Sequence, residues 1–297
     1  QTKLGIMANA NRSSILIQLK LKNKHNMLNL NKQTIINLHN DNGDQNKTFE
    51  FVDSSTIKEA DTISPPEVVH GMLYGKSKMI IGGHSKSYKS WFATQLGLAI
   101  AYGNEFIGFS TNQTKVFYLN LELPDFVINK RLFDLRANLG IIPKEGDGRF
   151  NLINARGIWN GLESLEVLGR QIADECEAPP VIVIDPIYKI HCMDENSTDQ
   201  MGELFKEIDH LINETQASVI MVHHFRKPSG DKKGGPSLHQ LCGSNVICRD
   251  MDTFVGISNK DDINFKAHFT LRGHPRHEDL EVKRKNNLFS IENPFAA

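Results

Sequence analysis

One short segment constrains the fold of this chain more than any other. Residues 79–81 are an apolar run of strand length, residues 82–88 are mostly small or polar, and Lys89 opens a stretch with apolar residues at helical spacing up to Tyr102. A buried strand that leads through a tight loop into a helix is the opening unit of α/β folds. The segment therefore predicts a strand whose carboxyl end meets the amino end of a helix.

The loop of this unit, residues 83–90, also fits phosphate binding, and we call it the phosphate loop. Backbone N–H groups and the partial positive charge of a helix amino end bind phosphate oxygens. Gly83, Lys89 and Ser90 match G-x-x-x-x-G-K-[ST], in which the lysine reaches the outer phosphates and the hydroxyl holds Mg²⁺. Tyr88 stands where the second glycine is expected, and glycine there allows close backbone approach. On the loop alone, a nucleotide site and an ordinary strand–turn–helix unit are equally good interpretations.

The rest of the chain alternates between strand-length and helix-length segments. We predict strands at 78–81, 115–121, 150–153, 181–184, 218–222, 253–257, 265–272 and 288–291, and helices at 89–102, 124–139, 161–177 and 198–215. This alternation is typical of a mostly parallel central sheet flanked by helices. Two prolines, Pro65 and Pro66, interrupt both kinds of element. We therefore expect residues 1–64 to be a poorly structured N-terminal extension or the remnant of an upstream domain, and residues 65–297 to be the α/β domain.

Acidic residues end two further predicted strands. Glu122 follows the strand at 115–121, and Asp185 follows the strand at 181–184. In a parallel sheet the ligand lies outside the carboxyl ends of the strands, so both carboxylates would face the phosphate loop. Asp185 would bind, through water, the Mg²⁺ that Ser90 holds, and Glu122 would orient or deprotonate the attacking water. A single acidic residue at a strand end is more often a solvated turn residue. The presence of two such residues downstream of the phosphate loop is what favours an ATPase.

Two histidines end a third strand. His223 and His224 follow the apolar run at 219–222. A polar side chain at this position can sense the outer phosphate. Metal binding is the less favoured interpretation, because adjacent residues at a strand end point in opposite directions and no third ligand is suitably spaced.

Composition excludes several other classes of protein. The chain has 34 Lys and Arg against 35 Asp and Glu, which argues against a wholly basic nucleic-acid binder but leaves room for a local basic patch. The uncharged run at 91–102 falls short of the ~20 residues of a membrane span, and we expect a cytoplasmic protein with no membrane partner. The four cysteines form no C-x-x-C pair, and we interpret them as incidental thiols.

Taken together, these motifs resemble the RecA-type ATPase family of AAA-like ATPases. The likeness is strongest to the RepA-like branch of hexameric replicative helicases of plasmids, phages and mobile elements, and it extends over residues 65–291. The motifs that carry it lie at 82–91, 118–122, 183–186, 222–224 and 242–246. The resemblance implies a RecA-like core that binds ATP and Mg²⁺, with Glu122 and Asp185 catalytic and His223 or His224 as phosphate sensor. The implied nucleotide-binding residues are Gly83, His84, Ser85, Lys86, Ser87, Tyr88, Lys89 and Ser90.

The resemblance also implies a homo-hexamer that acts on single-stranded DNA in replication. The loop at 226–236 corresponds to a channel loop, with Arg226, Lys227, Lys232 and Lys233 as DNA contacts. Such cations neutralise phosphates without reading sequence. An ordinary solvated loop is the alternative, since residues 226–241 contain no Phe, Tyr or Trp for base stacking. The basic run at 283–285 fits a nucleotide or DNA contact and equally a turn between two strands.

One departure from the family pattern keeps a second function open. Family members commonly carry an arginine finger just before the Gly243-Ser244 pair, where this chain has Cys242. Losing such a finger costs on the order of 10³ in rate. Replacements for it would be Arg249, Arg272 or Arg276. The alternatives to a helicase ATPase are therefore a regulatory or loader ATPase of a mobile element that does not translocate and, less favoured, an interaction module without nucleotide.

Overall fold

The computed structural model describes residues 36–38, 47–49, 51–225 and 245–291, and the chain divides into two compact units, Gln1–Ser64 and Pro65–Ala297. The described part of the first unit is small. Its strands β1 (Ile36–Leu38) and β2 (Lys47–Phe49) pair in antiparallel fashion, and two short 3-10 turns follow at Ser54–Thr56 and Glu59–Thr62.

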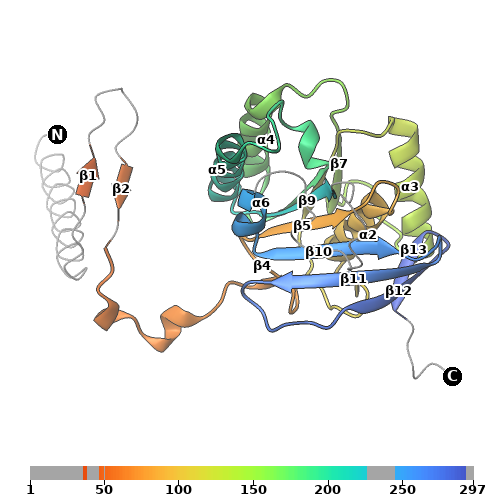
Figure 1. The fold of residues 1–297 in the computed structure, drawn as a ribbon, viewed down its shortest axis with the longest axis horizontal. Coiled ribbons are helices and arrows are strands. Elements are labelled where there is room, and N and C mark those ends of the chain that lie inside the picture. The colour runs from red at the N-terminus through yellow and green to blue at the C-terminus, as the bar shows by residue number, and fades with distance from the viewer. Residues whose placement is uncertain (1–35, 39–46, 50, 226–244, 292–297) are drawn as a thin grey trace, which may run out of the picture. The chain divides into compact units, whose positions relative to one another are not determined.

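A nine-stranded sheet forms the second unit (Figure 1), in the order β13-β12-β11-β10-β5-β9-β8-β6-β7. The strands are β5 (Lys78–Gly83), β6 (Val116–Asn120), β7 (Phe150–Asn154), β8 (Val181–Asp185), β9 (Ser218–His224), β10 (Thr253–Asn259), β11 (Asn264–Leu271), β12 (Leu280–Lys285) and β13 (Leu288–Ile291). The strands from β10 to β7 in this order are mutually parallel, whereas β11, β12 and β13 are added as an antiparallel meander. A separate hairpin of β3 (Glu67–Val69) and β4 (Leu73–Tyr74) precedes the sheet.

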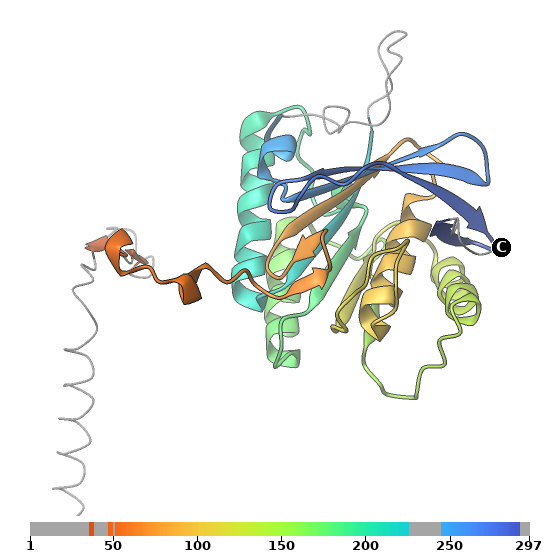
Figure 2. The same ribbon diagram turned by 90° about the horizontal axis from the view of Figure 1, so that it is seen from below.

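Helices cover both faces of the parallel strands, as Figure 2 shows with the teal and green helices on one side and the yellow ones on the other. The helices are α2 (Lys89–Tyr102), α3 (Asp125–Asn138), α4 (Gly161–Glu175), α5 (Thr198–Thr215) and the short α6 (Asn245–Asp250). Helices α2 and α3 share one face, where Leu98 packs with Leu132 and Leu135. Helices α4 and α5 share the other.

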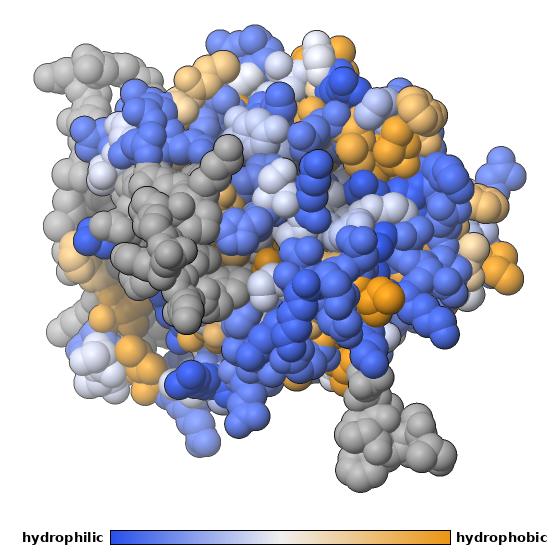
Figure 3. All heavy atoms as spheres, turned by 45° about the vertical axis from the view of Figure 1, so that its right-hand side comes forward, coloured by the Kyte–Doolittle hydropathy of each residue, from blue (hydrophilic) through white to orange (hydrophobic). Residues whose placement is uncertain are grey.

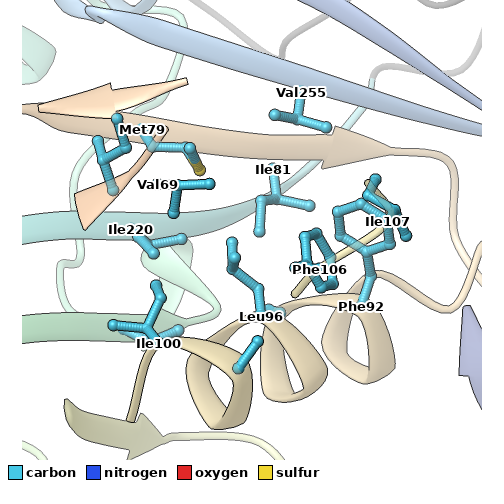
Figure 4. Close-up of a cluster of buried hydrophobic side chains, with 14 of the residues drawn as sticks. Val69, Met79, Ile81, Phe92, Leu96, Ile100, Phe106, Ile107, Ile220 and Val255 are labelled. Carbon is cyan, nitrogen blue, oxygen red and sulfur yellow. The ribbon is translucent and has the colours of Figure 1, made fainter. Parts of the chain in front are cut away.

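The alternation of side chains along β5 divides the core between these two faces. Met79 and Ile81 point to the α2 face, where they meet Leu96 and Ile100 (Figure 4), whereas Ile80 points to the α4 and α5 face. All three side chains are fully buried, as expected for a central strand of a parallel sheet. This central position fixes the carboxyl end of β5, from which the phosphate loop starts.

The predicted α/β class, with a mostly parallel sheet flanked by helices, is confirmed, and two predicted helices, 89–102 and 198–215, match α2 and α5 residue for residue. Strand β12 was not predicted, because LEVKRK lacks a regular apolar alternation. The basic run at 283–285 lies on this strand and not in a turn; the turn is formed by Asn286 and Asn287, both at positive φ.

Figure 3 shows one face of the molecule, on which hydrophilic residues predominate and the apolar residues among the described ones form only small areas. Among the helices of the described residues, none combines the length and the apolar character that crossing a bilayer requires.

Candidate active site

A cavity of about 480 Å³ lies at the carboxyl ends of β5, β6, β8 and β9. It brings together most of the residues that the sequence predicted for one site. Its lining consists of Ser85, Lys86, Ser87, Tyr88, Lys89, Ser90, Trp91, Glu122, Leu123, Arg131, Asp185, Val222 and His224. Larger cavities occur elsewhere in the described residues, but the strand ends and the helix amino end make this one the site suited to an anionic ligand.

The phosphate loop is closely folded on itself. A Cβ atom at Gly83 would lie 2.5 Å from Ser87 Oγ and 2.8 Å from the carbonyl oxygen of Ile257, so only glycine fits there. The backbone N–H of Ser87 donates to the carbonyl of His84 at 3.2 Å. The ammonium of Lys89 donates to the same carbonyl at 2.7 Å and lies 3.5 Å from Ser87 Oγ. The loop thus places a buried cation at the amino end of α2.

Tyr88 adopts the conformation for which the second glycine is used in this motif. Its backbone has φ 60° and ψ 24°, in the left-handed region, where it serves as the N-cap of α2. A side chain in this region costs of order 1–3 kcal/mol, which glycine avoids. Tyr88 therefore preserves the backbone geometry of the loop, but its left-handed backbone is strained where glycine's would not be.

Ser90 and Asp185 are paired beside the loop. The Ser90 hydroxyl donates to Asp185 Oδ1 at 3.0 Å, and the hydroxyl of Tyr118 donates to Asp185 Oδ2 at 2.5 Å. Asp185 is only 4% exposed, and burial raises its pKa although both hydrogen bonds oppose the rise. The Ser90 and Asp185 oxygens are the hard ligands that Mg²⁺ prefers, with phosphates and waters completing such a site. No cluster of three or more metal-ligating His, Cys, Asp or Glu residues occurs in the part of the chain that the structure describes.

Glu122 follows the end of β6 and is exposed at the cavity rim. The Tyr188 hydroxyl, from the segment after β8, donates to Glu122 Oε1 at 3.3 Å, and the Tyr188 ring lies 5.7 Å from the ring of His224. Burial, together with the Glu122 carboxylate, raises the pKa of Tyr188, so this phenol stays protonated and remains a donor. Tyr188 thus links two of the predicted catalytic residues.

The two histidines at the end of β9 point in opposite directions. His224 lines the cavity, and burial followed by the nearby Lys89 ammonium lowers the pKa of its imidazole. A neutral imidazole at this place can donate one hydrogen bond to a phosphate. His223 is 2% exposed and does not line the cavity; its Nδ1 lies 4.0 Å from Glu195. Of the two candidate sensors, His224 is the one that faces the phosphate loop.

Two further residues of the site were not among the predicted site residues, although Tyr118 belongs to the 118–122 motif. Tyr118 is buried in β6, and the signal available in the sequence was a tyrosine within an apolar strand, whose hydroxyl must find a partner. Arg131 on α3 is 8% exposed, lines the cavity, and stacks its guanidinium 4.6 Å from the Trp91 ring. Its Nε and Nη1 have no hydrogen-bond partner among the described residues. Burial lowers the pKa of Arg131, which Tyr118 and Asp185 partly offset.

Some predicted residues lie outside the described part of the chain, and others are described but do not line this cavity. The candidate DNA contacts Arg226, Lys227, Lys232 and Lys233 lie outside the described residues, as does Cys242. Of the three candidate replacements for the finger, Arg272 donates to the carbonyl of Arg249 and lies 4.0 Å from Asp252. None of the three lines the cavity.

A phosphate loop at the carboxyl edge of a mostly parallel sheet, with Ser90 paired to Asp185, defines the class of P-loop ATPases with a RecA-like fold. A family model described as the AAA domain matches residues 45–230, more than half of the chain, and the chain belongs to this family.

Solved structures show the same fold at low sequence identity. A structure described as an ATPase domain is similar over 73% of this chain and 86% of its own, with TM-score 0.59 and 13% identity. The RadB recombinase is similar over 73% of this chain and 91% of its own, with TM-score 0.52 and 15% identity. A DnaB-like replicative helicase, described with its primase interactions, is similar over 73% of this chain but 59% of its own, with TM-score 0.58 and 12% identity.

Proposed function

We propose that the protein binds ATP with Mg²⁺ in the cavity above the phosphate loop and hydrolyses it. The observation that carries this proposal is the pairing of Ser90 with Asp185 at 3.0 Å beside the buried ammonium of Lys89. A hydroxyl, a carboxylate and an ammonium in this arrangement suit a metal-bound triphosphate. An uncharged ligand would make no use of the buried positive charge of Lys89.

Each side chain of the site has a distinct task in this reaction. The loop's backbone N–H groups and Lys89 bind the phosphates; Ser90 and Asp185 would hold Mg²⁺, which would supply positive charge to stabilise the phosphate oxygens in the transition state. Glu122 orients the attacking water and accepts its proton, and Tyr188 orients Glu122. His224, the last residue of β9, contacts the outer phosphate and relays its presence to the segment that follows β9.

The hydrolysis drives movement on single-stranded DNA by a homo-hexamer, as in a plasmid- or phage-type replicative helicase. Two observations support this finer proposal: the similar solved structures include a replicative helicase, and the sequence carries cations at Arg226, Lys227, Lys232 and Lys233 directly after β9. Cys242 favours the second candidate, a regulatory or loader ATPase that switches with ATP without translocating.

The test is Mg-ATP hydrolysis with and without single-stranded DNA at one salt concentration, because DNA contacts of this kind are salt-dependent. Lys89→Ala and Glu122→Gln are compared with the parent chain, and Lys206→Ala on the exposed face of α5 serves as the matched control. DNA-stimulated turnover lost in both site variants and kept in the control supports the helicase proposal. ATP binding with slow turnover that DNA does not alter supports the regulatory ATPase. Turnover unchanged in Lys89→Ala contradicts both.

A further inference from the structure

Tyr88 is the residue at which this phosphate loop departs from its motif, and its surroundings compensate for the departure. Glycine adopts φ near 60° without a steric cost, whereas tyrosine adopts it only if neighbouring groups hold it there. The relevant neighbours are therefore the groups in contact with the Tyr88 side chain.

Three contacts hold the Tyr88 side chain, and all come from the antiparallel part of the sheet. The Arg284 guanidinium on β12 lies 3.9 Å from the centre of the Tyr88 ring. The Phe265 ring on β11 meets it edge-on at 5.8 Å. The Tyr88 hydroxyl donates to Asp262 Oδ1, in the turn before β11, at 3.3 Å. The loop is thus anchored to strands more than 170 residues later in the chain.

Arg284 is itself held in place for this contact. Its backbone N–H donates to the carbonyl of Ile263 at 2.7 Å, and its Nη2 donates to the side chain of Asn287. The same guanidinium lies 5.7 Å from the Trp91 ring, at the start of α2. Arg284 therefore lies between an aromatic residue of the phosphate loop and one of the helix that follows, and does not line the cavity itself.

We propose that Arg284 is a positioning residue that clamps the phosphate loop through Tyr88. By holding the Tyr88 ring, Arg284 holds the left-handed backbone of Tyr88, and with it the amides and the Lys89 side chain that bind phosphate. This inference rests on the proposed function, because it assumes that the loop binds ATP. The planar guanidinium is essential to the clamp, since lysine cannot stack on a ring in the same way. A loop with glycine at position 88 needs no clamp.

The test is a double-mutant cycle on the affinity for Mg-ATP, measured by calorimetric titration. Arg284→Ala is expected to weaken binding roughly 3- to 30-fold, the range of a partly buried cation–π contact. In the Tyr88→Gly background the same substitution is expected to change affinity by less than about twofold. Arg284→Lys is expected to recover only part of the loss. Lys206→Ala, which removes a charge from an exposed position of α5 far from the Tyr88 contacts in the chain, is the control and should bind as the parent does.

Steady-state kinetics and unfolding midpoints distinguish a clamp from a general loss of structure. With Arg284→Ala the KM for ATP should rise while kcat at saturating ATP and the unfolding midpoint stay near the parent values. Equal affinity of the parent and Arg284→Ala would overturn the clamp while leaving the proposed function intact. An equal loss in the Tyr88→Gly background would also overturn it, because Arg284 would then act on the nucleotide directly. A parent chain that binds no Mg-ATP would overturn the proposed function and the clamp together.

Discussion

The Ser90 hydroxyl donates a hydrogen bond to Asp185 Oδ1 at 3.0 Å, although 95 residues separate the two in the chain. Ser90 is the second residue of α2, the helix that follows β5, and Asp185 ends β8. Strand β9 lies between β5 and β8 in the sheet. The parallel register of β5, β9 and β8 brings their carboxyl ends to one edge. The sheet order thus creates the pair on which the proposed magnesium site depends.

The ionised carboxylate of Asp185 is expected to lower the stability of the fold while serving Mg²⁺ binding. Its folded-state pKa lies above the ordinary 3.8, so its ionised form is less favourable in the folded chain than in the unfolded one, and its contribution to stability is lost as pH rises through the folded pKa. At pH 7 the ionised carboxylate therefore costs stability. Asp185→Asn removes the charge and should raise the midpoint of thermal unfolding at pH 7 without nucleotide, while weakening Mg²⁺ binding about 10- to 100-fold.

The same comparison repeated near pH 3 supplies the control for Asp185→Asn. There the parent carboxyl is largely protonated, so the difference in midpoint between parent and variant should shrink. A variant that unfolds at a lower temperature than the parent at pH 7 would contradict this explanation.

The opposite directions of the two histidines predict different consequences of losing each one. His224→Ala removes a neutral donor from the cavity and should lower ATP turnover by about 10²-fold with a small effect on stability. His223→Ala removes a buried side chain outside the cavity and should destabilise the fold by roughly 0.5–3 kcal/mol. Turnover and urea unfolding measured on both variants check this. The reverse assignment of the two effects would show that His223 is the sensor.

Tyr188→Phe removes the hydroxyl that donates to Glu122 and keeps the ring that packs near His224. A single hydrogen bond of this kind contributes about 0.5–1.5 kcal/mol, so kcat should fall by about 2- to 10-fold. KM and the free energy of unfolding should stay unchanged, because neither phosphate binding nor core packing involves the hydroxyl. A change in KM with constant kcat would place Tyr188 in nucleotide binding instead.

An ion cluster around Lys78, the first residue of β5, gives a prediction for stability alone. Lys78 Nζ lies 2.7 Å from Asp209 Oδ1 and 2.5 Å from Asp250 Oδ2. Lys78→Met leaves both carboxylates without their cation and should lower the free energy of unfolding by about 1–3 kcal/mol. The value is discounted from that of a fully buried pair because the Asp209 side chain is 48% exposed.

The pH dependence of this cluster follows from the pKa of Lys78. Burial lowers that pKa, but the two carboxylates more than offset burial and raise it above the ordinary 10.5. The stabilisation is therefore fully present below about pH 10 and is lost as pH rises through the folded-state pKa. Urea unfolding should show a constant difference between the parent and Lys78→Met from pH 6 to 9 that narrows in alkali. A difference that narrows toward acid within that range would contradict the cluster's role.

Much of the fold could be predicted because the residues that begin and end its helices are local sequence signals. Helix α2 ends at Tyr102 and is capped by Gly103 at φ 67°, and α5 begins after Ser197, whose side chain accepts from the Gln200 N–H. The sheet's antiparallel edge could not be predicted as readily, because β12 is a charged strand whose pairing to β11 and β13 is set by tertiary contacts.

Some residues of the candidate site could likewise be predicted from the sequence, whereas others could not. Lys89, Ser90 and Asp185 follow from motifs that fix residue type and spacing. Arg131 reaches the cavity from α3, and Tyr188 contacts Glu122 from the segment after β8; only the packing of these elements brings them there. Which of His223 and His224 faces the cavity depends on the direction in which each side chain points at the end of β9, and no motif specifies that direction.

The most direct test of the central claim is calorimetric titration of Mg-ATP into the parent chain and into Lys89→Ala. If the cavity above the phosphate loop is the nucleotide site, the parent binds Mg-ATP with a saturable heat that is absent or greatly weakened in Lys89→Ala, and the Lys206→Ala control binds as the parent does. Equal binding by the parent and Lys89→Ala would contradict the assignment of this cavity to ATP.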